Sequence, residues 1–215
     1  MKIAIIGAGN VGRSLAAGWS RARHEVTFGV ADPTKPGVAE VARALSNTTV
    51  RANCDAVADA DAIVLAVPWD AVPVAVGECG DLRGRVLIDA TNPLSFGDAG
   101  LELALGFSDS GGETVARLAP GARVVKTMNQ VGFAVMSATD GYPTPPVMFL
   151  AGDDEEAKTV ARGLVTDLGF EVFDAGPLRQ ARLLEPLAML WTDQALNRGA
   201  PATNALSFMQ KAGGR

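Results

Sequence analysis

The chain has 215 residues, of which 48 % are hydrophobic and 20 % charged, and its formal net charge is −5. This length predicts one large domain, or one domain with a small appendage, and the composition excludes an intrinsically disordered chain. An acidic balance argues against general nucleic-acid binding, which usually needs a basic face.

The few cysteines and the single histidine exclude several kinds of site. Cys54 and Cys79 do not make a disulfide framework and fit a reducing compartment. Glycines interrupt the N-terminal apolar run after Ile6, so this run predicts neither a signal peptide nor a membrane span. We therefore expect a cytoplasmic protein with no membrane partner. His24 alone argues against a histidine-rich metal site, and a Ser-His-Asp triad would have to use it.

Short apolar runs alternate with amphipathic segments along most of the chain. The amphipathic segments predict helices at residues 10–21 and 38–45. The apolar runs predict buried parallel strands at residues 2–6, 24–28, 62–67, 86–90, 123–127 and 147–151. Strands that alternate with helices predict a doubly wound, mostly parallel α/β sheet of the Rossmann type.

A stretch rich in proline and glycine, residues 139–146, is the predicted boundary between two parts of the chain. Residues 1–145 would form the larger domain and residues 146–215 a small α/β unit. In that unit the pattern predicts a helix at 153–168, a strand at 171–174 and a mostly helical tail from 178 to about 210. Apolar residues at helical spacing in the tail favour core or subunit packing and predict a homo-oligomer, most simply a dimer. They are Leu183, Leu184, Leu187, Leu190 and Trp191.

A glycine motif follows the first predicted strand and opens the first predicted helix. It reads Gly7-Ala8-Gly9-Asn10-Val11-Gly12, a complete G-x-G-x-x-G. Gly7 permits a tight turn, Gly9 lets a diphosphate approach the backbone, and Gly12 lets the helix pack closely on the strand. Free N–H groups at the helix start would face the diphosphate, so the motif predicts dinucleotide binding.

The residues after the second strand bear on which dinucleotide binds. Asp32 has the spacing of an acidic residue that holds the ribose 2′-hydroxyl of NAD, but Asp32-Pro33 also resembles a turn beyond the strand. Lys35 would attract the 2′-phosphate of NADP, or could be a solvated surface charge. We favour NADP, and NAD stays possible.

Several further segments, taken together, resemble the coenzyme F420-dependent NADP oxidoreductase family, also known as predicted dinucleotide-binding enzymes. The resemblance covers almost the whole chain, and the segment 174–187 is its most specific part. The segments that carry it, besides the glycine motif, are Ala66-Val67-Pro68-Trp69, Asp89-Ala90-Thr91-Asn92-Pro93-Leu94, Val124-Val125-Lys126, Gly152-Asp153-Asp154, Asp174-Ala175-Gly176-Pro177-Leu178 and Ala181-Arg182-Leu183-Leu184-Glu185-Pro186-Leu187.

The resemblance implies a Rossmann domain that binds NADP(H) and a C-terminal unit that closes an acceptor pocket, with F420 as the suspected co-substrate. Val30 and Ala31 stand where family members offer a Ser and an Arg to the 2′-phosphate, and only Lys35 matches there. Asn129 stands where archaeal members carry a His. The implied cofactor-binding residues are Gly7, Ala8, Gly9, Asn10, Val11, Gly12, Ala31, Lys35, Ala66, Val67, Pro68 and Trp69.

Hydride transfer between two bound rings needs alignment and exclusion of water more than a strong acid or base. Asn92, Asn129 or the backbone near Gly132 could donate a hydrogen bond to the acceptor as charge develops, although each Asn could equally be a turn residue. Lys126 could be catalytic, but it is better interpreted as a structural charge paired with a carboxylate such as Asp89.

The leading hypothesis is an oxidoreductase that moves hydride between NADP(H) and a deazaflavin or flavin-like small-molecule acceptor. One alternative is an NAD(P)-dependent reductase of a small imine or carbonyl compound, which would need a placed acid such as Lys126. Another is a regulatory protein that binds NAD(P) without turnover. No metal is predicted for any of these.

Overall fold

The computed structural model describes residues 1–35, 37–98, 100–137, 139–209 and 211. Eight strands form one sheet in the order β10-β9-β8-β5-β4-β1-β2-β3, and neighbours are parallel except for β8 and β9. The strands of this sheet are β1 (Lys2–Ile6), β2 (Glu25–Val30), β3 (Thr48–Ala52), β4 (Ala62–Leu65), β5 (Val86–Asp89), β8 (Arg123–Lys126), β9 (Val147–Gly152) and β10 (Glu171–Asp174).

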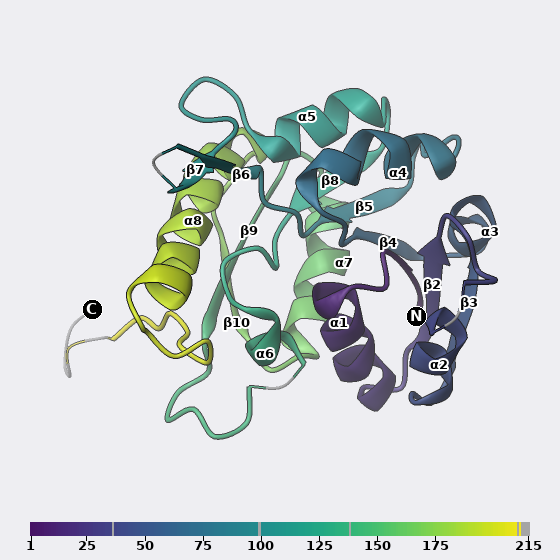
Figure 1. Ribbon diagram of the computed structural model, residues 1–215, viewed down its shortest axis with the longest axis horizontal. Helices are drawn as coiled ribbons and strands as arrows, with labels where there is room; N and C mark the ends of the chain where they lie inside the picture. Colours follow the sequence, from purple (N-terminus) through teal and green to yellow (C-terminus); the bar gives the residue numbers. More distant parts are fainter. Residues whose placement is uncertain (36, 99, 138, 210, 212–215) are drawn as a thin grey trace.

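Helices cover both faces of the sheet, as the doubly wound prediction requires (Figure 1). On β1, Ile3 and Ile5 pack with α1, α6 and α7, whereas Ala4 and Ile6 pack with α3, α4 and α5. The helices are α1 (Asn10–Arg21), α2 (Val38–Arg43), α3 (Asn53–Ala58), α4 (Val72–Glu78), α5 (Gly111–Leu118), α6 (Phe133–Met136), α7 (Glu155–Thr166) and α8 (Ala181–Asn197). Both faces of the central strands are therefore core, which explains their unbroken apolar sequence.

The C-terminal part of the chain continues the same sheet. β9 runs antiparallel to β8, and β10 pairs in parallel with β9. Beyond them, α8 packs against a two-stranded hairpin made of β6 (Leu94–Gly97) and β7 (Gly100–Leu103), and the two lie together on the left of Figure 1. No helix in the described part of the chain combines the length and hydrophobicity that a membrane span requires.

Some of the expected ends of strands and helices were wrong. β2 extends to Val30, two residues further than expected. The helical tail ends at Asn197, and most of the chain from Arg198 to Met209 is irregular. Its predicted end near residue 210 lies outside the described residues. Three strands were not expected. β3 is a half-exposed edge strand that has no apolar run, and β6 and β7 are short and mostly exposed.

Candidate functional site

The turn between β1 and α1 has a shape that only glycine allows at Gly7. Its φ is +109°, and a Cβ there would lie 2.5 Å from the carbonyl oxygen of Ala66. Its N–H donates to the carbonyl of Gly29 at 2.9 Å, which places the turn beside the end of β2. The turn therefore lies where β1, β2 and β4 all reach their carboxyl ends, as expected for a dinucleotide site.

Gly9 and Gly12 have the different roles that the motif predicts: Gly12 allows close packing, and Gly9 leaves open space. A Cβ on Gly12 would lie 2.1 Å from the carbonyl oxygen of Gly7, so the close packing of α1 on the turn requires glycine. A Cβ on Gly9 would meet no atom within 4 Å. Gly9 is also the N-cap of α1, and no side chain caps the helix. Open space in front of uncapped first-turn N–H groups fits a diphosphate.

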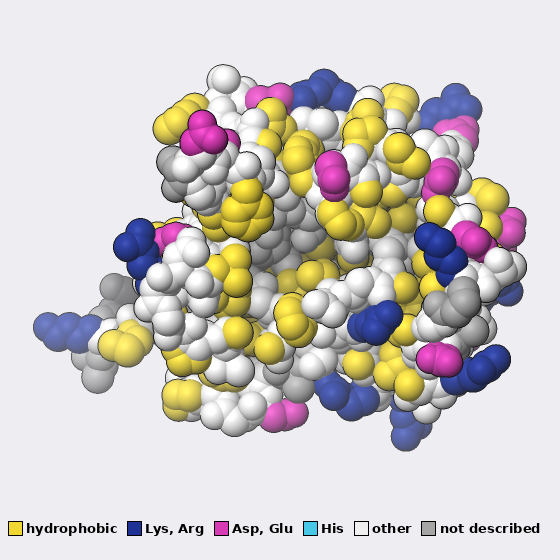
Figure 2. All heavy atoms as spheres, in the orientation of Figure 1, with side chains coloured by type: hydrophobic (Ala, Val, Ile, Leu, Met, Phe, Trp, Pro, Cys, Tyr) yellow, Lys and Arg dark blue, Asp and Glu magenta, His cyan; other side chains and the backbone are white. Residues whose placement is uncertain are grey.

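The segment after β4 forms the next wall of this crevice. Val67 Cγ1 would lie 2.9 Å from a Cβ on Gly7, so Val67 touches the glycine turn. Pro68 is exposed, and Trp69 is half-buried, with its ring close to Gly111 at the start of α5. Figure 2 shows this face of the molecule hollowed between α8, α4 and α1 of Figure 1. Of the predicted cofactor residues, the structure thus brings Gly7 together with Ala66 and Val67, while Trp69 lies against the start of α5.

The loop after β2 is exposed and carries one anion and one cation. The Thr34 hydroxyl and N–H both donate to Asp32 Oδ1, at 2.6 and 2.9 Å. Both bonds lower the pKa of Asp32 below its ordinary value, and the bond from the Thr34 hydroxyl has the larger effect. The turn interpretation of Asp32 is therefore confirmed, and the carboxylate is ionised. Ala31 and Lys35 are exposed on the same loop.

Arg13 is a residue of this region that the sequence pattern did not single out. Its Nε donates to the carbonyl of Ala8 at 2.8 Å, which holds the guanidinium beside the glycine turn. The available signal was the basic residue that directly follows the last glycine of the motif. A planar guanidinium at this position suits a phosphate group.

On the other side of the crevice, Asn92 and Asn129 join the ends of β5 and β8. Asn92 Nδ2 donates to the Asn129 carbonyl at 3.0 Å, and Asn129 Nδ2 donates to Asn92 Oδ1 at 3.1 Å. Asn129 is 4 % exposed, and its Oδ1 accepts a 2.7 Å hydrogen bond from Gln130. Asn129 is thus committed to internal contacts, whereas Asn92 is half-buried and uses one of its two amide hydrogens here.

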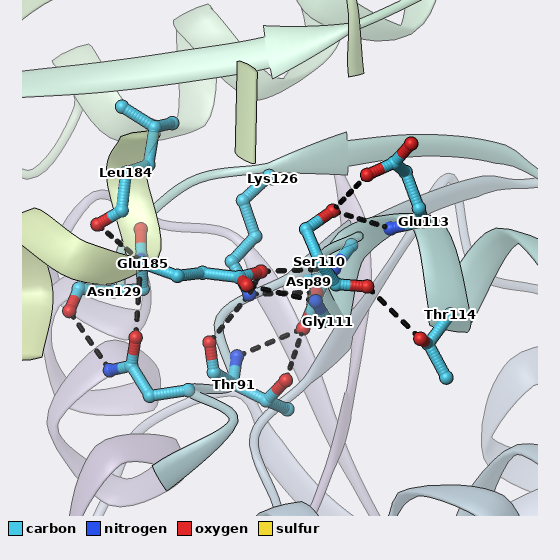
Figure 3. Close-up of polar contacts among 12 residues, drawn as sticks. Asp89, Thr91, Ser110, Gly111, Glu113, Thr114, Lys126, Asn129, Leu184 and Glu185 are labelled. Carbon is cyan, nitrogen blue, oxygen red and sulfur yellow. Dashed lines mark hydrogen bonds and ion pairs between the residues drawn. The ribbon is translucent and has the colours of Figure 1, made fainter. Parts of the chain in front are cut away.

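Lys126 lies behind this pair, and its side chain is fully buried. The ammonium donates to Asp89 Oδ2 at 2.9 Å and to the Thr91 carbonyl at 2.6 Å, and it lies 3.0 Å from Glu185 Oε1 (Figure 3). Burial alone would lower the pKa of Lys126, but the two carboxylates outweigh it and raise that pKa. The expected pairing with Asp89 is confirmed.

Glu185 comes from α8 and reaches the N-terminus of α5. Its carboxylate accepts hydrogen bonds from the N–H groups of Gly111 and Gly112, at 2.8 and 3.0 Å. Ser110, the N-cap of α5, accepts from the next N–H, that of Glu113. A carboxylate here is favoured by the helix dipole as well as by Lys126. No local sequence pattern predicts this contact, because it joins segments more than 70 residues apart.

His24 has a structural setting rather than a catalytic one. Its Nε2 lies 2.9 Å from a carboxylate oxygen of Asp167 at the end of α7. The ring is nearly buried at the start of β2. It does not join the residues of the crevice.

Comparisons with known proteins identify relatives of this chain. Residues 2–93 match the family model described as NADP oxidoreductase, coenzyme F420-dependent. The chain is 32 % identical to the F420-dependent NADP reductase of Methanothermobacter thermautotrophicus over 203 residues, covering 88 % of this chain and 87 % of that protein.

Solved structures agree with the fold. A candidate F420-dependent NADP reductase from Arthrobacter has a TM-score of 0.87 at 30 % identity, over 98 % of this chain and all of that one. A protein from Sinorhizobium meliloti has a TM-score of 0.74 at 31 % identity, over 83 % of this chain and 86 % of that one. An imine reductase from Aspergillus terreus, at 19 % identity and a TM-score of 0.61, shares the fold alone.

The open glycine turn at the carboxyl ends of β1 and β4, together with these relatives, defines an NADP-dependent oxidoreductase of the Rossmann class. More particularly, the chain belongs to the family of F420-dependent NADP reductases. The resemblance and the fold class read from the sequence are thereby confirmed.

Proposed function

We propose that this oxidoreductase transfers a hydride between NADP(H) and a planar ring acceptor, deazaflavin F420 or a flavin-like molecule. The family supplies the first half of this proposal. The second half rests on the chemistry available at the ends of β5 and β8, where the Asn92 amide is half-buried and keeps one hydrogen free in the described contacts, whereas Asp89 and Lys126 are fully buried.

The chain's own residues would bind and orient the two rings. The uncapped N–H groups at the start of α1 would hold the diphosphate, whereas Gly7 shapes the turn, since its own N–H is bonded to the carbonyl of Gly29. Lys35, on the loop after β2, and Arg13, on α1, are the cations that would bind the 2′-phosphate. Ala66–Trp69 line the path of the dinucleotide, with Ala31 at its adenosine end. When bound, the nicotinamide supplies the carbon that gives or takes the hydride.

Asn92 is the residue we assign to the acceptor ring. Its second amide hydrogen can donate to a ring nitrogen or oxygen as charge develops there. Asn129 then acts by holding Asn92, since its own amide is bonded internally. Trp69 and the start of α8 would exclude water on the two sides of the rings.

One observation favours a ring acceptor over an imine or carbonyl substrate. Reduction of those substrates needs a proton donor at the reacting atom. Lys126, the acid that the sequence offered for this task, is fully buried, and two carboxylates and a carbonyl surround its ammonium. An acceptor that takes hydride with only a hydrogen bond from Asn92 fits this site better.

The experiment mixes the purified protein with oxidised F420 and either NADPH or NADH, and follows the loss of deazaflavin absorbance. We expect turnover with NADPH and a preference for NADPH over NADH. FMN and a cyclic imine are tested in parallel. Turnover of the imine alone would refute the ring acceptor, and binding of NADPH measured separately would show that the cofactor site is nevertheless intact.

We also propose a homodimer in which residues 146–215 close the acceptor side and supply the contact together with the β6–β7 hairpin. Leu183 and Leu190 lie seven residues apart on α8 and are 65 % and 59 % exposed. Phe96, 78 % exposed, belongs to the hairpin that packs beside α8. Apolar side chains of this size, gathered on neighbouring elements, are typical of a subunit contact.

A further inference from the structure

Three ionisable side chains are enclosed together behind the crevice. Lys126 and Asp89 are fully buried, and the side chain of Glu185 is 2 % exposed. Two carboxylates face one ammonium, so the cluster carries one more negative than positive charge. In a poorly polarisable interior each ion must stay within reach of its partners, since separation leaves it without solvation. The cluster is therefore a stiff connection between the elements that carry it.

Its bonds converge on Thr91, at the acceptor side of the crevice. Asp89 Oδ1 accepts from the Thr91 N–H at 2.9 Å and from its hydroxyl at 2.7 Å. The Thr91 carbonyl accepts from Lys126 at 2.6 Å. Each polar group of Thr91 is thus held by the cluster, and the next residue is Asn92.

The buried cluster is also connected to α8. Glu185 joins α8 to Lys126 and to the N-terminus of α5, and the preceding carbonyl, that of Leu184, accepts from Asn129 Nδ2 at 3.3 Å. A displacement of α8 would therefore pull on Lys126 and on Asn129 together. Lys126 holds Thr91, as Figure 3 shows, and Thr91 directly precedes Asn92. Asn129 bonds directly to Asn92.

We propose that Lys126 and Glu185 are positioning residues: the buried cluster fixes the place of Asn92 relative to the nicotinamide by coupling it to α8. The part of this inference that concerns catalysis rests on the proposed ring acceptor, but the coupling itself does not. Neither residue touches the reacting atoms. Both act through Thr91 and the Asn92–Asn129 pair.

The decisive variant is Glu185→Gln. It leaves Asp89 and Lys126 as a balanced pair, so the protein should fold, while the Gln amide lacks the negative charge that attracts the ammonium, and only its oxygen can accept a hydrogen bond. The matched control is Glu113→Gln, which removes the charge from a second ion pair between α5 and α8. Glu113 binds Arg182 at 2.6 and 2.8 Å on the solvent side, away from Thr91 and Asn129.

Hydrogen exchange of the whole protein, with no acceptor present, tests the coupling. In Glu185→Gln we expect faster exchange, by about an order of magnitude, in peptides that cover residues 90–94 and 127–131 as well as 111–113. Peptides of the glycine turn, residues 5–13, should not change. Glu113→Gln should leave 90–94 and 127–131 as in the wild type. Faster exchange confined to 111–113 and α8, or equal effects of the two variants, would overturn the coupling.

Kinetics with oxidised F420 test the consequence for catalysis. We expect Glu185→Gln to raise the KM for F420 or lower kcat by about tenfold, with the NADPH dissociation constant unchanged. A variant that is merely less stable would show wild-type constants below its unfolding temperature, and that result would remove the positioning role. If the wild type itself does not turn F420 over, the acceptor assignment fails, and the exchange result still decides the coupling.

Discussion

Gly9 is the position where a side chain would occupy space that the diphosphate needs. We expect Gly9→Val to weaken NADPH binding by about a hundredfold or more, because two methyl groups would block the uncapped N–H groups of α1. The fold should survive, since a Cβ at Gly9 meets no neighbour within 4 Å. Titration of NADPH by fluorescence measures the loss. Gly163→Val is the control, as Gly163 is equally open and lies on α7.

Lys35 and Arg13 are predicted to discriminate between the two dinucleotides. We expect Lys35→Ala and Arg13→Met each to weaken NADPH by roughly tenfold and NADH little, since charged hydrogen bonds to a phosphate contribute about 1.5–3 kcal/mol. Dissociation constants for both cofactors check this. Equal losses of affinity for NADPH and NADH would show that the residue binds the diphosphate rather than the 2′-phosphate. Arg83→Ala, at an exposed ion pair with Asp81, is the control.

Among the strands and helices, β5, β8 and α8 are held together by the ammonium group of Lys126. Lys126→Met would leave Asp89 and Glu185 buried without a cation, and we expect it to lower the free energy of unfolding by about 3–5 kcal/mol. Glu185→Gln should cost less, since it leaves a balanced pair. Urea unfolding of both variants measures the difference. A loss in Lys126→Met no greater than that in Glu185→Gln would contradict this order.

A second, partly exposed ion pair, Glu113–Arg182, joins α5 to α8, and its contribution to stability depends on pH. The hydrogen bond from Arg182 lowers the pKa of Glu113 below its ordinary value of 4.5. The pair therefore stabilises the fold above that value, and its contribution disappears as the pH falls through the lowered pKa. Because the two side chains are partly exposed, we expect Glu113→Gln to cost only about 0.5–1 kcal/mol at pH 7, and less at a pH below the lowered pKa. Urea unfolding at both pH values tests this.

Local patterns allowed the two elements that flank the glycine turn in sequence to be predicted to the residue. β1 and α1 have their expected bounds, since a buried strand, a glycine motif and an amphipathic helix are all encoded within 20 consecutive residues. The Asp89–Lys126 pair was also accessible, because both residues end buried strands. The role of Glu185 was not, since a charge on an amphipathic helix gives no sign that it points inward.

At the scale of the whole molecule, the exposed apolar side chains of α8 predict association. We expect the wild type to elute with twice the mass of one chain in size exclusion with light scattering. Leu183→Glu combined with Leu190→Glu should give a single chain, because buried carboxylates would oppose the contact. A wild type that remains a single chain at all concentrations would refute the dimer.

The contact between Trp19 and Leu164 has a consequence for how the chain can be divided. The indole of Trp19, on α1, is fully buried, and its Nε1 donates to the carbonyl of Leu164 on α7 at 2.8 Å. The first helix thus completes its core with residues from the last third of the chain. The core therefore runs across residue 145. A fragment that ends there would expose the face on which α1 rests, so the glycine turn would not keep its shape without the C-terminal third.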